Sequence, residues 1–135
     1  MGCDIHVRIE VRKKEETDWK ELTFKNNIDD GGIEILNYRN YDVFAHLVGV
    51  TNFNNVVPAL EINGIPDDVS ESVKNNYEHW KDYAYSAAHF YDKQIYEIVR
   101  KSDGILSPFI IEINKYIYSL NNPLDYQWRV IFWFD

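Results

Sequence analysis

The chain opens with a stretch in which apolar and polar side chains alternate. Because successive side chains of a strand point to opposite faces, this alternation predicts a half-buried β-strand over residues 3–12. A polar turn over residues 13–17 and a second strand over residues 18–24 are expected to complete a hairpin. The polar face of the first strand consists of Asp4, His6, Arg8, Glu10 and Arg12.

The last residues of the chain, 126–134, also alternate, but both of their faces are largely apolar. On the less apolar face, only Gln127 and Arg129 are polar. A strand that is apolar on both sides is typical of the centre of a covered sheet. We therefore place this strand centrally, and we predict that the first and last strands are neighbours because both are long and strongly patterned.

Between these strands the apolar residues recur with helical spacing. The spacing and the turn residues predict helices over residues 41–48, about 69–80, 92–101 and 107–120. Asn40 and Gly49 are suitable caps for the first of them, and Ser107 followed by Pro108 for the last. The predicted fold class is α+β: a single domain, residues 1–135, with a small, mainly antiparallel sheet covered by three or four helices.

The charge of the chain limits the partners that it can bind. The formal net charge is −8, and residues 26–100 hold five basic against twelve acidic residues. Binding to a nucleic-acid backbone requires a row of Lys and Arg, and the chain has no such row. Direct nucleic-acid binding is therefore not expected. An acidic surface either contacts a basic site on another protein or keeps the molecule in solution.

The single cysteine excludes a disulfide within the chain. No apolar run approaches the roughly 18–20 residues of a membrane span, and the N-terminus lacks an apolar secretory segment. We expect a cytoplasmic protein that does not bind membranes.

Two residues of the first strand are candidates for chemistry. Asp4 and His6 are two residues apart, so both side chains project from one face, within reach of a common ion or ligand. Glu10 is about 13 Å beyond His6 along the strand, which is too far to share a metal with Asp4. Arg129 would pair with Asp4 or Glu10 if the first and last strands are neighbours. The alternative is a solvated face with cross-strand ion pairs. Because tight metal sites need three or four ligands, no metal, cofactor or catalytic residue is predicted.

A second candidate site precedes the first predicted helix. Backbone amides at a helix start attract anions, and Arg39 next to them would favour a phosphate or carboxylate. The alternative is that Asn40 only caps the helix. Tyr38 and Tyr41, on either side, are candidates for stacking on a base.

Four segments of the chain resemble one family. They are the opening Met-Gly-Cys-Asp-Ile-His with Glu10, the Arg-Asn-Tyr-Asp-Val-Phe-Ala of residues 39–45, residues 64–70, and the closing segment that ends in Phe-Trp-Phe-Asp. Together they resemble, from the first residue to the last, an uncharacterised family of phage, prophage and bacterial proteins. The chain departs from this family after the central helix, where relatives often show Asp-x-His-Ser. Here residues 82–86 have Tyr85 in place of that His, which removes the most obvious third metal ligand.

The resemblance implies a setting, because small phage proteins without catalytic motifs often counter host defences. Our lead hypothesis is a binding protein that sequesters a small anionic ligand, a nucleotide immune signal. One alternative is direct inhibition of a host defence protein through the acidic surface, and another is a metal-dependent phosphohydrolase that uses Asp4 and His6. The residues expected to bind the ligand are Asp4, His6, Arg39, Asn40, Tyr41, Tyr85, Ser86 and Arg129.

The aromatic content predicts a homo-oligomer. Aromatic residues make up 16% of the chain, more than a core of this size needs, and a symmetric contact would bury rings that a monomer exposes. Light scattering at micromolar concentration should therefore return a multiple of 16.0 kDa. A monomer mass would contradict the prediction.

Overall fold

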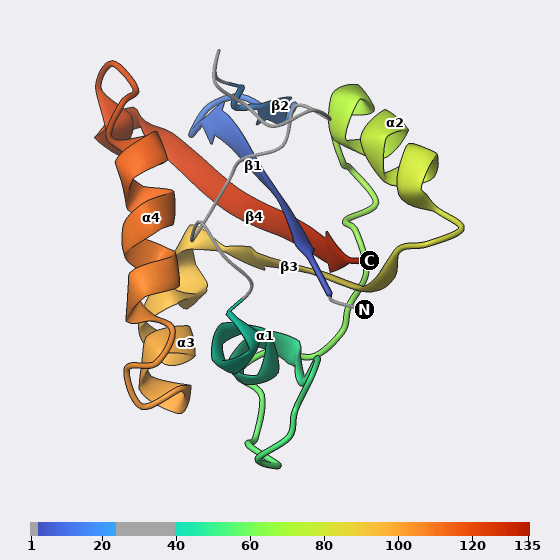
Figure 1. Cartoon of the computed structure of the whole chain (residues 1–135). Coiled ribbons are helices and arrows are strands. Elements are labelled where there is room, and N and C mark those ends of the chain that lie inside the picture. The colour runs from blue at the N-terminus through green and yellow to red at the C-terminus, as the bar shows by residue number, and fades with distance from the viewer. Residues whose placement is uncertain (1–2, 24–39) are drawn as a thin grey trace.

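Four antiparallel strands form a sheet in the order β2-β1-β4-β3 (Figure 1). The computed structural model describes residues 3–23 and 40–135 of the chain. The strands are β1 (Ile5–Lys13), β2 (Lys20–Glu21), β3 (Tyr85–Tyr91) and β4 (Tyr126–Phe134). With four α-helices in the described ranges packed around this sheet, the fold is the single α+β domain that the sequence predicts.

β1 and β4 lie side by side in the middle of the sheet. Their residue pairs run without interruption from Ile5 opposite Phe134 to Lys13 opposite Tyr126. β2 pairs with the outer side of β1, and β3 with the outer side of β4. Two predictions are thereby confirmed: the first and last strands are neighbours, and the last strand is central.

The helices begin and end close to their predicted positions. They are α1 (Tyr41–Val48), α2 (Glu71–Trp80), α3 (Ile95–Lys101) and α4 (Ser107–Ile117), with 3₁₀ turns η1 (Asp92–Gln94) and η2 (Pro123–Asp125). Asn40 Oδ1 accepts a hydrogen bond from the Val43 amide, and Gly49 ends α1 in the left-handed conformation with φ 84°. None of the helices in the described ranges combines the length and the apolar character needed to cross a bilayer.

The two faces of the sheet are covered by different helices. One face packs against α1, α3 and α4, whose buried residues include Phe44, Ile98 and Phe109. The opposite face packs at one end against α2, where Val73 contacts a small cluster with Ile131 of β4. Figure 1 shows α2 separated by the sheet from α3 and α4. Both faces of the central strands are therefore shielded from solvent.

The structure differs from the sequence analysis at three places, of which the first is an element that was not predicted. Residues 85–91 form β3, an edge strand that the sequence patterns do not indicate; Ser86 has φ 53° there, and the pairing with β4 shifts register between Tyr85 and Ala88. This irregularity disrupts the strict alternation on which the prediction of strands depends. The second strand is only two residues long within the described ranges. Ser107 is the first residue of α4, and the preceding Leu106 occupies the cap position.

The largest correction concerns the polar face of β1. The prediction of a half-buried strand with a solvated polar face is wrong, because Arg8 and Glu10 are 2% and 0% exposed. Arg8 forms an ion pair with Glu21 of β2, and Glu10 forms one with Arg129 of β4. The cross-strand ion pairs that the spacing suggested are present, but they are buried.

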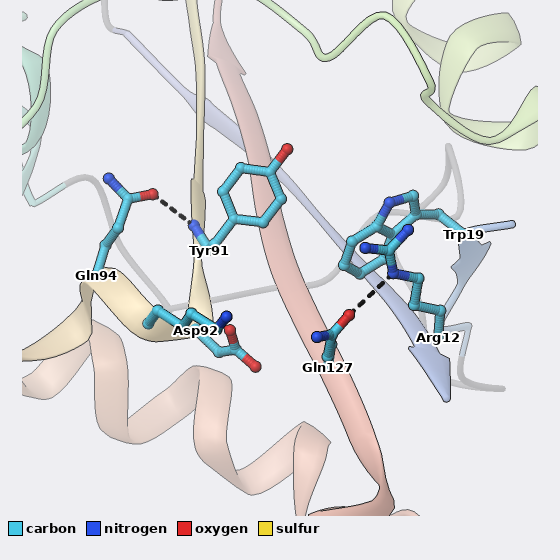
Figure 2. A pocket seen from close by; sticks show the side chains of 7 residues that line it. Arg12, Trp19, Tyr91, Asp92, Gln94 and Gln127 are labelled. Carbon is cyan, nitrogen blue, oxygen red and sulfur yellow. Dashed lines mark hydrogen bonds between the residues drawn. The ribbon is translucent and has the colours of Figure 1, made fainter. Parts of the chain in front are cut away.

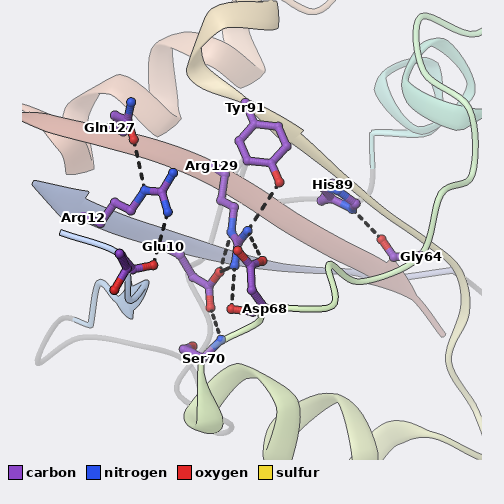
Figure 3. Close-up of polar contacts among 10 residues, drawn as sticks. Glu10, Arg12, Gly64, Asp68, Ser70, His89, Tyr91, Gln127 and Arg129 are labelled. Carbon is purple, nitrogen blue, oxygen red and sulfur yellow. Dashed lines mark hydrogen bonds and ion pairs between the residues drawn. The ribbon is translucent and has the colours of Figure 1, made fainter. Parts of the chain in front are cut away.

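Glu10 and Arg129 are the centre of a network that reaches beyond the sheet (Figure 3). Glu10 Oε1 lies 2.6 Å from Arg129 Nε, and Glu10 Oε2 accepts a hydrogen bond of 2.7 Å from the Ser70 amide at the start of α2. Arg129 Nη1 donates to Asp68 Oδ1 at 2.7 Å, and Nη2 donates to the Asp68 carbonyl at 3.2 Å. The network fixes the segment before α2 against the two central strands.

Substituting Arg129 should therefore destabilise the fold strongly. Arg129→Met retains apolar volume but leaves Glu10 buried without its cation, which is expected to lower the free energy of unfolding by about 3–5 kcal/mol. Urea denaturation followed by circular dichroism measures this loss. The matched control is Arg100→Met, in which the lost ion pair with Glu97 is exposed and little stability should be lost. Equal stability losses in the two variants would contradict the stabilising role of the buried ion pair between Glu10 and Arg129.

Candidate functional site

The structure divides the residues predicted to bind a ligand between two parts of the molecule. Asp4 lies at the end of the sheet where the first and last described residues meet: its amide donates to the Asp135 carbonyl at 3.3 Å, and the Asp135 amide donates to the Asp4 carbonyl at 3.1 Å. His6 lies beside them, with its Nε2 at 3.2 Å from Asp135 Oδ2. Asp4 and His6 thus both contact Asp135 at this end of the sheet.

Tyr41 and Tyr85 join the same end of the sheet through Cys3. The Tyr85 hydroxyl lies 2.9 Å from Cys3 Sγ, and the Cys3 amide donates to the Tyr41 hydroxyl at 3.3 Å. The hydrogen bond with Cys3, together with burial, raises the pKa of Tyr85 to about 12. Ser86 follows Tyr85 in the irregular first part of β3. Five of the predicted residues, Asp4, His6, Tyr41, Tyr85 and Ser86, thus lie around the N-terminal end of β1.

The ring of His6 is packed between tryptophans. Its centroid is 4.4 Å from that of Trp80 and 5.8 Å from that of Trp133. Within residues 3–23 and 40–135, no group of three or more His, Cys, Asp or Glu side chains is arranged to hold a metal ion.

The predicted anion site before α1 is described only in part. Asn40 serves as the helix cap, which is the simpler of its two interpretations. Arg39 and Tyr38 lie outside the described residues, so their proposed contacts with a ligand stay predictions.

Arg129 does not lie with Asp4 and His6. His6 is opposite Trp133 on β4, four residues further along the strand, and Arg129 is opposite Glu10. Its guanidinium is fully buried and bonded to Glu10 and Asp68, with a further bond of 3.4 Å from Nη1 to the Tyr91 hydroxyl. Through these contacts Arg129 holds Glu10, Asp68 and Tyr91 in position.

A pocket that the sequence patterns do not indicate opens beside Arg129. It has a volume of about 310 Å³, and Figure 2 shows the side chains that line it. Three segments converge on it: the end of β1 with the turn before β2, the junction of β3 with η1, and the start of β4. The described lining residues are Arg12, Trp19, Tyr91, Asp92, Lys93, Gln94 and Gln127.

One wall of the pocket is a stack of cationic and aromatic groups. The guanidinium carbons of Arg12 and Arg129 lie 4.3 and 4.2 Å from the ring centroid of Trp19. Arg12 Nε donates to Gln127 Oε1 at 3.0 Å, and Nη1 donates to the Thr17 carbonyl at 3.2 Å. Because these contacts fix its orientation, the Arg12 guanidinium is held in place before any ligand arrives.

The facing wall is held by hydrogen bonds around η1. Gln94 Oε1 accepts from the Tyr91 amide at 2.8 Å, and Asp92 Oδ2 accepts from the Trp128 amide at 3.2 Å. Lys93 is exposed between them. The pocket therefore combines two cations, Arg12 and Lys93, with one carboxylate that is already bonded to the backbone. Gln94 and Gln127 also line it and can bond the edge of a ligand.

The interaction of Asp68 with Arg129 should make stability depend on pH. The hydrogen bond from Arg129, its positive charge and a hydrogen bond with Trp19 lower the pKa of Asp68 below 3.8. A carboxyl group whose pKa is lowered on folding stabilises the fold above its unfolded pKa, and this contribution disappears as the pH falls through the folded pKa. Its contribution is thus present at neutral pH and lost in acid.

We expect Asp68→Asn to lose less stability than the wild type between about pH 5 and pH 2. The measurement is urea denaturation across that pH range. Asp67→Asn is the control, because it removes the adjacent exposed carboxylate, which has no ion pair with a described residue. An Asp68→Asn protein with the full acid dependence of the wild type would contradict this role of Asp68.

Comparison with known proteins adds no further information to the geometry. No protein-family model matches the chain, no curated protein matches it, and no solved structure matches it.

Proposed function

We propose that the protein binds a small anionic ligand that carries a planar ring, such as a nucleotide, in the pocket beside Trp19. The observation that carries this proposal is the Arg12 guanidinium, which is packed on Trp19 and held by Gln127 at the wall of a pocket of about 310 Å³. A cation fixed in this way contacts an anion without first losing conformational freedom.

The charges at the pocket favour an anion. The chain as a whole has a formal charge of −8. Among the described residues that line the pocket, by contrast, the two positive charges of Arg12 and Lys93 outnumber the one negative charge of Asp92. Guanidinium groups bind phosphate through charge-assisted, often bidentate hydrogen bonds. The two hydrogen bonds from Arg12 to the protein use its Nε and Nη1 atoms. Among the described residues, none accepts a hydrogen bond from Nη2, so this donor can contact a ligand.

The other lining residues suit a planar ring. Tyr91 and Trp19 form a tilted aromatic pair in the pocket lining, with ring centroids 6.1 Å apart and planes at 53°, and the Arg12 guanidinium packs on Trp19. Rings and guanidinium planes stack on bases with little dependence on sequence. The amides of Gln94 and Gln127 provide both donors and acceptors for a base edge or a ribose.

The phage setting that the sequence resemblance implies suggests a role for such binding. In the cytoplasm of an infected host, a protein that retains a nucleotide immune signal would counter the defence that the signal activates. Binding alone is sufficient for this role, and no catalytic step is proposed. Inhibition of a host protein through the acidic surface and hydrolysis at Asp4 and His6 stay alternative predictions from the sequence.

The proposal predicts measurable binding of AMP that depends on Arg12. Arg12→Ala removes a charge-assisted contact worth about 1.5–3 kcal/mol, which corresponds to a ten- to hundredfold weaker affinity. Isothermal titration calorimetry measures the affinity, and the melting temperature shows whether the variant is folded. Lys93→Ala should weaken binding too and, because Lys93 is exposed, should leave the fold unchanged.

The matched control is Arg100→Ala, which makes the same substitution at an exposed site on α3, outside the pocket. This variant should bind AMP as the wild type does. If wild-type protein fails to bind AMP at millimolar concentration, or if the Arg100 and Arg12 variants lose affinity equally, the pocket is not the proposed site.

A further inference from the structure

A second pocket adjoins the first at the corner of the sheet where β3 ends. It has a volume of about 300 Å³ and shares Asp92, Lys93 and Gln127 with the first pocket. β3 pairs with β4 only as far as Tyr91 opposite Arg129, so the first residues of β4 have no β3 partner. The Asp92 side chain bonds the Trp128 amide there. The two pockets meet around this open edge of β4.

The second pocket resembles the first in chemistry. Its apolar wall includes Tyr118 at the end of α4, Leu124 in η2, and Tyr126. Tyr118 and Leu124 are 66% and 80% exposed, so their apolar surface is accessible to a ligand in this pocket. Lys14 and the shared Lys93 provide the cations. Aromatic surface and positive charge thus occur together for a second time.

We propose that the two pockets form one site for a dinucleotide, in which each pocket holds one base and Lys93 contacts the phosphate that links them. The inference rests on the proposed function, because the first base occupies the pocket of Arg12 and Trp19. It extends that function from a single nucleotide to two nucleotides joined by a phosphodiester.

The sizes of the pockets favour the larger ligand. Pockets for small molecules span about 300–1,000 Å³, so each of these pockets alone is at the lower limit, and the two together are well inside the range. A mononucleotide in the first pocket would leave Tyr118 and Leu124 uncovered. The single bonds of a phosphodiester allow the ligand to bend around the edge of β4 to reach both pockets.

The position of Lys93 favours the linking phosphate. Lys93 lines both pockets and is exposed between them, whereas Arg12 lines only the first pocket and Lys14 only the second. A phosphate between the two bases would therefore meet the shared cation, and a terminal phosphate would meet one of the other two. Joining two binding groups makes the second contact intramolecular, which raises affinity without any stronger individual contact.

The test compares pApA, two adenylates joined by a phosphodiester, with AMP and ADP. ADP matches the charge of pApA but has one base, so a tighter affinity for pApA than for ADP reports the second base. We expect wild-type protein to bind pApA at least about tenfold more tightly than ADP in calorimetry. Tyr118→Ala should reduce the pApA affinity about tenfold, to near that of ADP.

The matched control is Tyr96→Ala on α3, a similarly exposed tyrosine outside both pockets. It should bind pApA as the wild type does. If AMP binds through Arg12 but pApA binds no more tightly than ADP, or if Tyr118→Ala binds pApA normally, the two-pocket site is overturned and the proposed function stands. If neither AMP nor pApA binds, both proposals are overturned.

Discussion

The ion pair between Glu10 and Arg129 is the interaction on which the rest of the structure depends. The two residues face each other on β1 and β4, and neither side chain is exposed. Transferring two charges out of water is costly unless their other donors and acceptors also find partners. Here they do: Glu10 accepts a hydrogen bond from the Ser70 amide, and Arg129 donates hydrogen bonds to Asp68 and Tyr91. One buried pair thereby links the central strands to the start of α2.

The same guanidinium supports the candidate binding pocket. Arg129 lies against the ring of Trp19, and Arg12 lies against that ring at the pocket wall. An apolar side chain in place of Arg129 would remove this support and leave the charge of Glu10 buried without a partner. The position of Arg12 is therefore coupled to a contact inside the sheet. The stability of the fold and the proposed binding thus depend on one set of residues at this end of the molecule.

The two ends of the sheet use their polar residues differently. At the end that contains Cys3 and His6, the side chains contact one another: Tyr85 bonds Cys3, and the His6 ring packs between two tryptophans. At the opposite end, β3 does not extend alongside the first residues of β4. The Asp92 side chain accepts the hydrogen bond from the Trp128 amide there, in place of a partner on β3. This early end of an edge strand is what opens space for the two adjoining pockets.

The sequence by itself determined the elements that depend on local periodicity and capping. β1 and β4 follow from alternation, and α1 follows from Asn40 and Gly49, because these signals act over a few neighbouring residues. The pairing of β1 with β4 is inferred from the length and strong patterning of both strands. The tertiary structure alone decided that the polar face of β1 is buried, since that depends on α2 packing on this side of the sheet and on ion-pair partners from β2 and β4. It also decided which residues share a pocket: Arg12, Trp19 and Tyr91 are distant in sequence, and the bulged β3 that positions Tyr91 has no regular alternation to predict it.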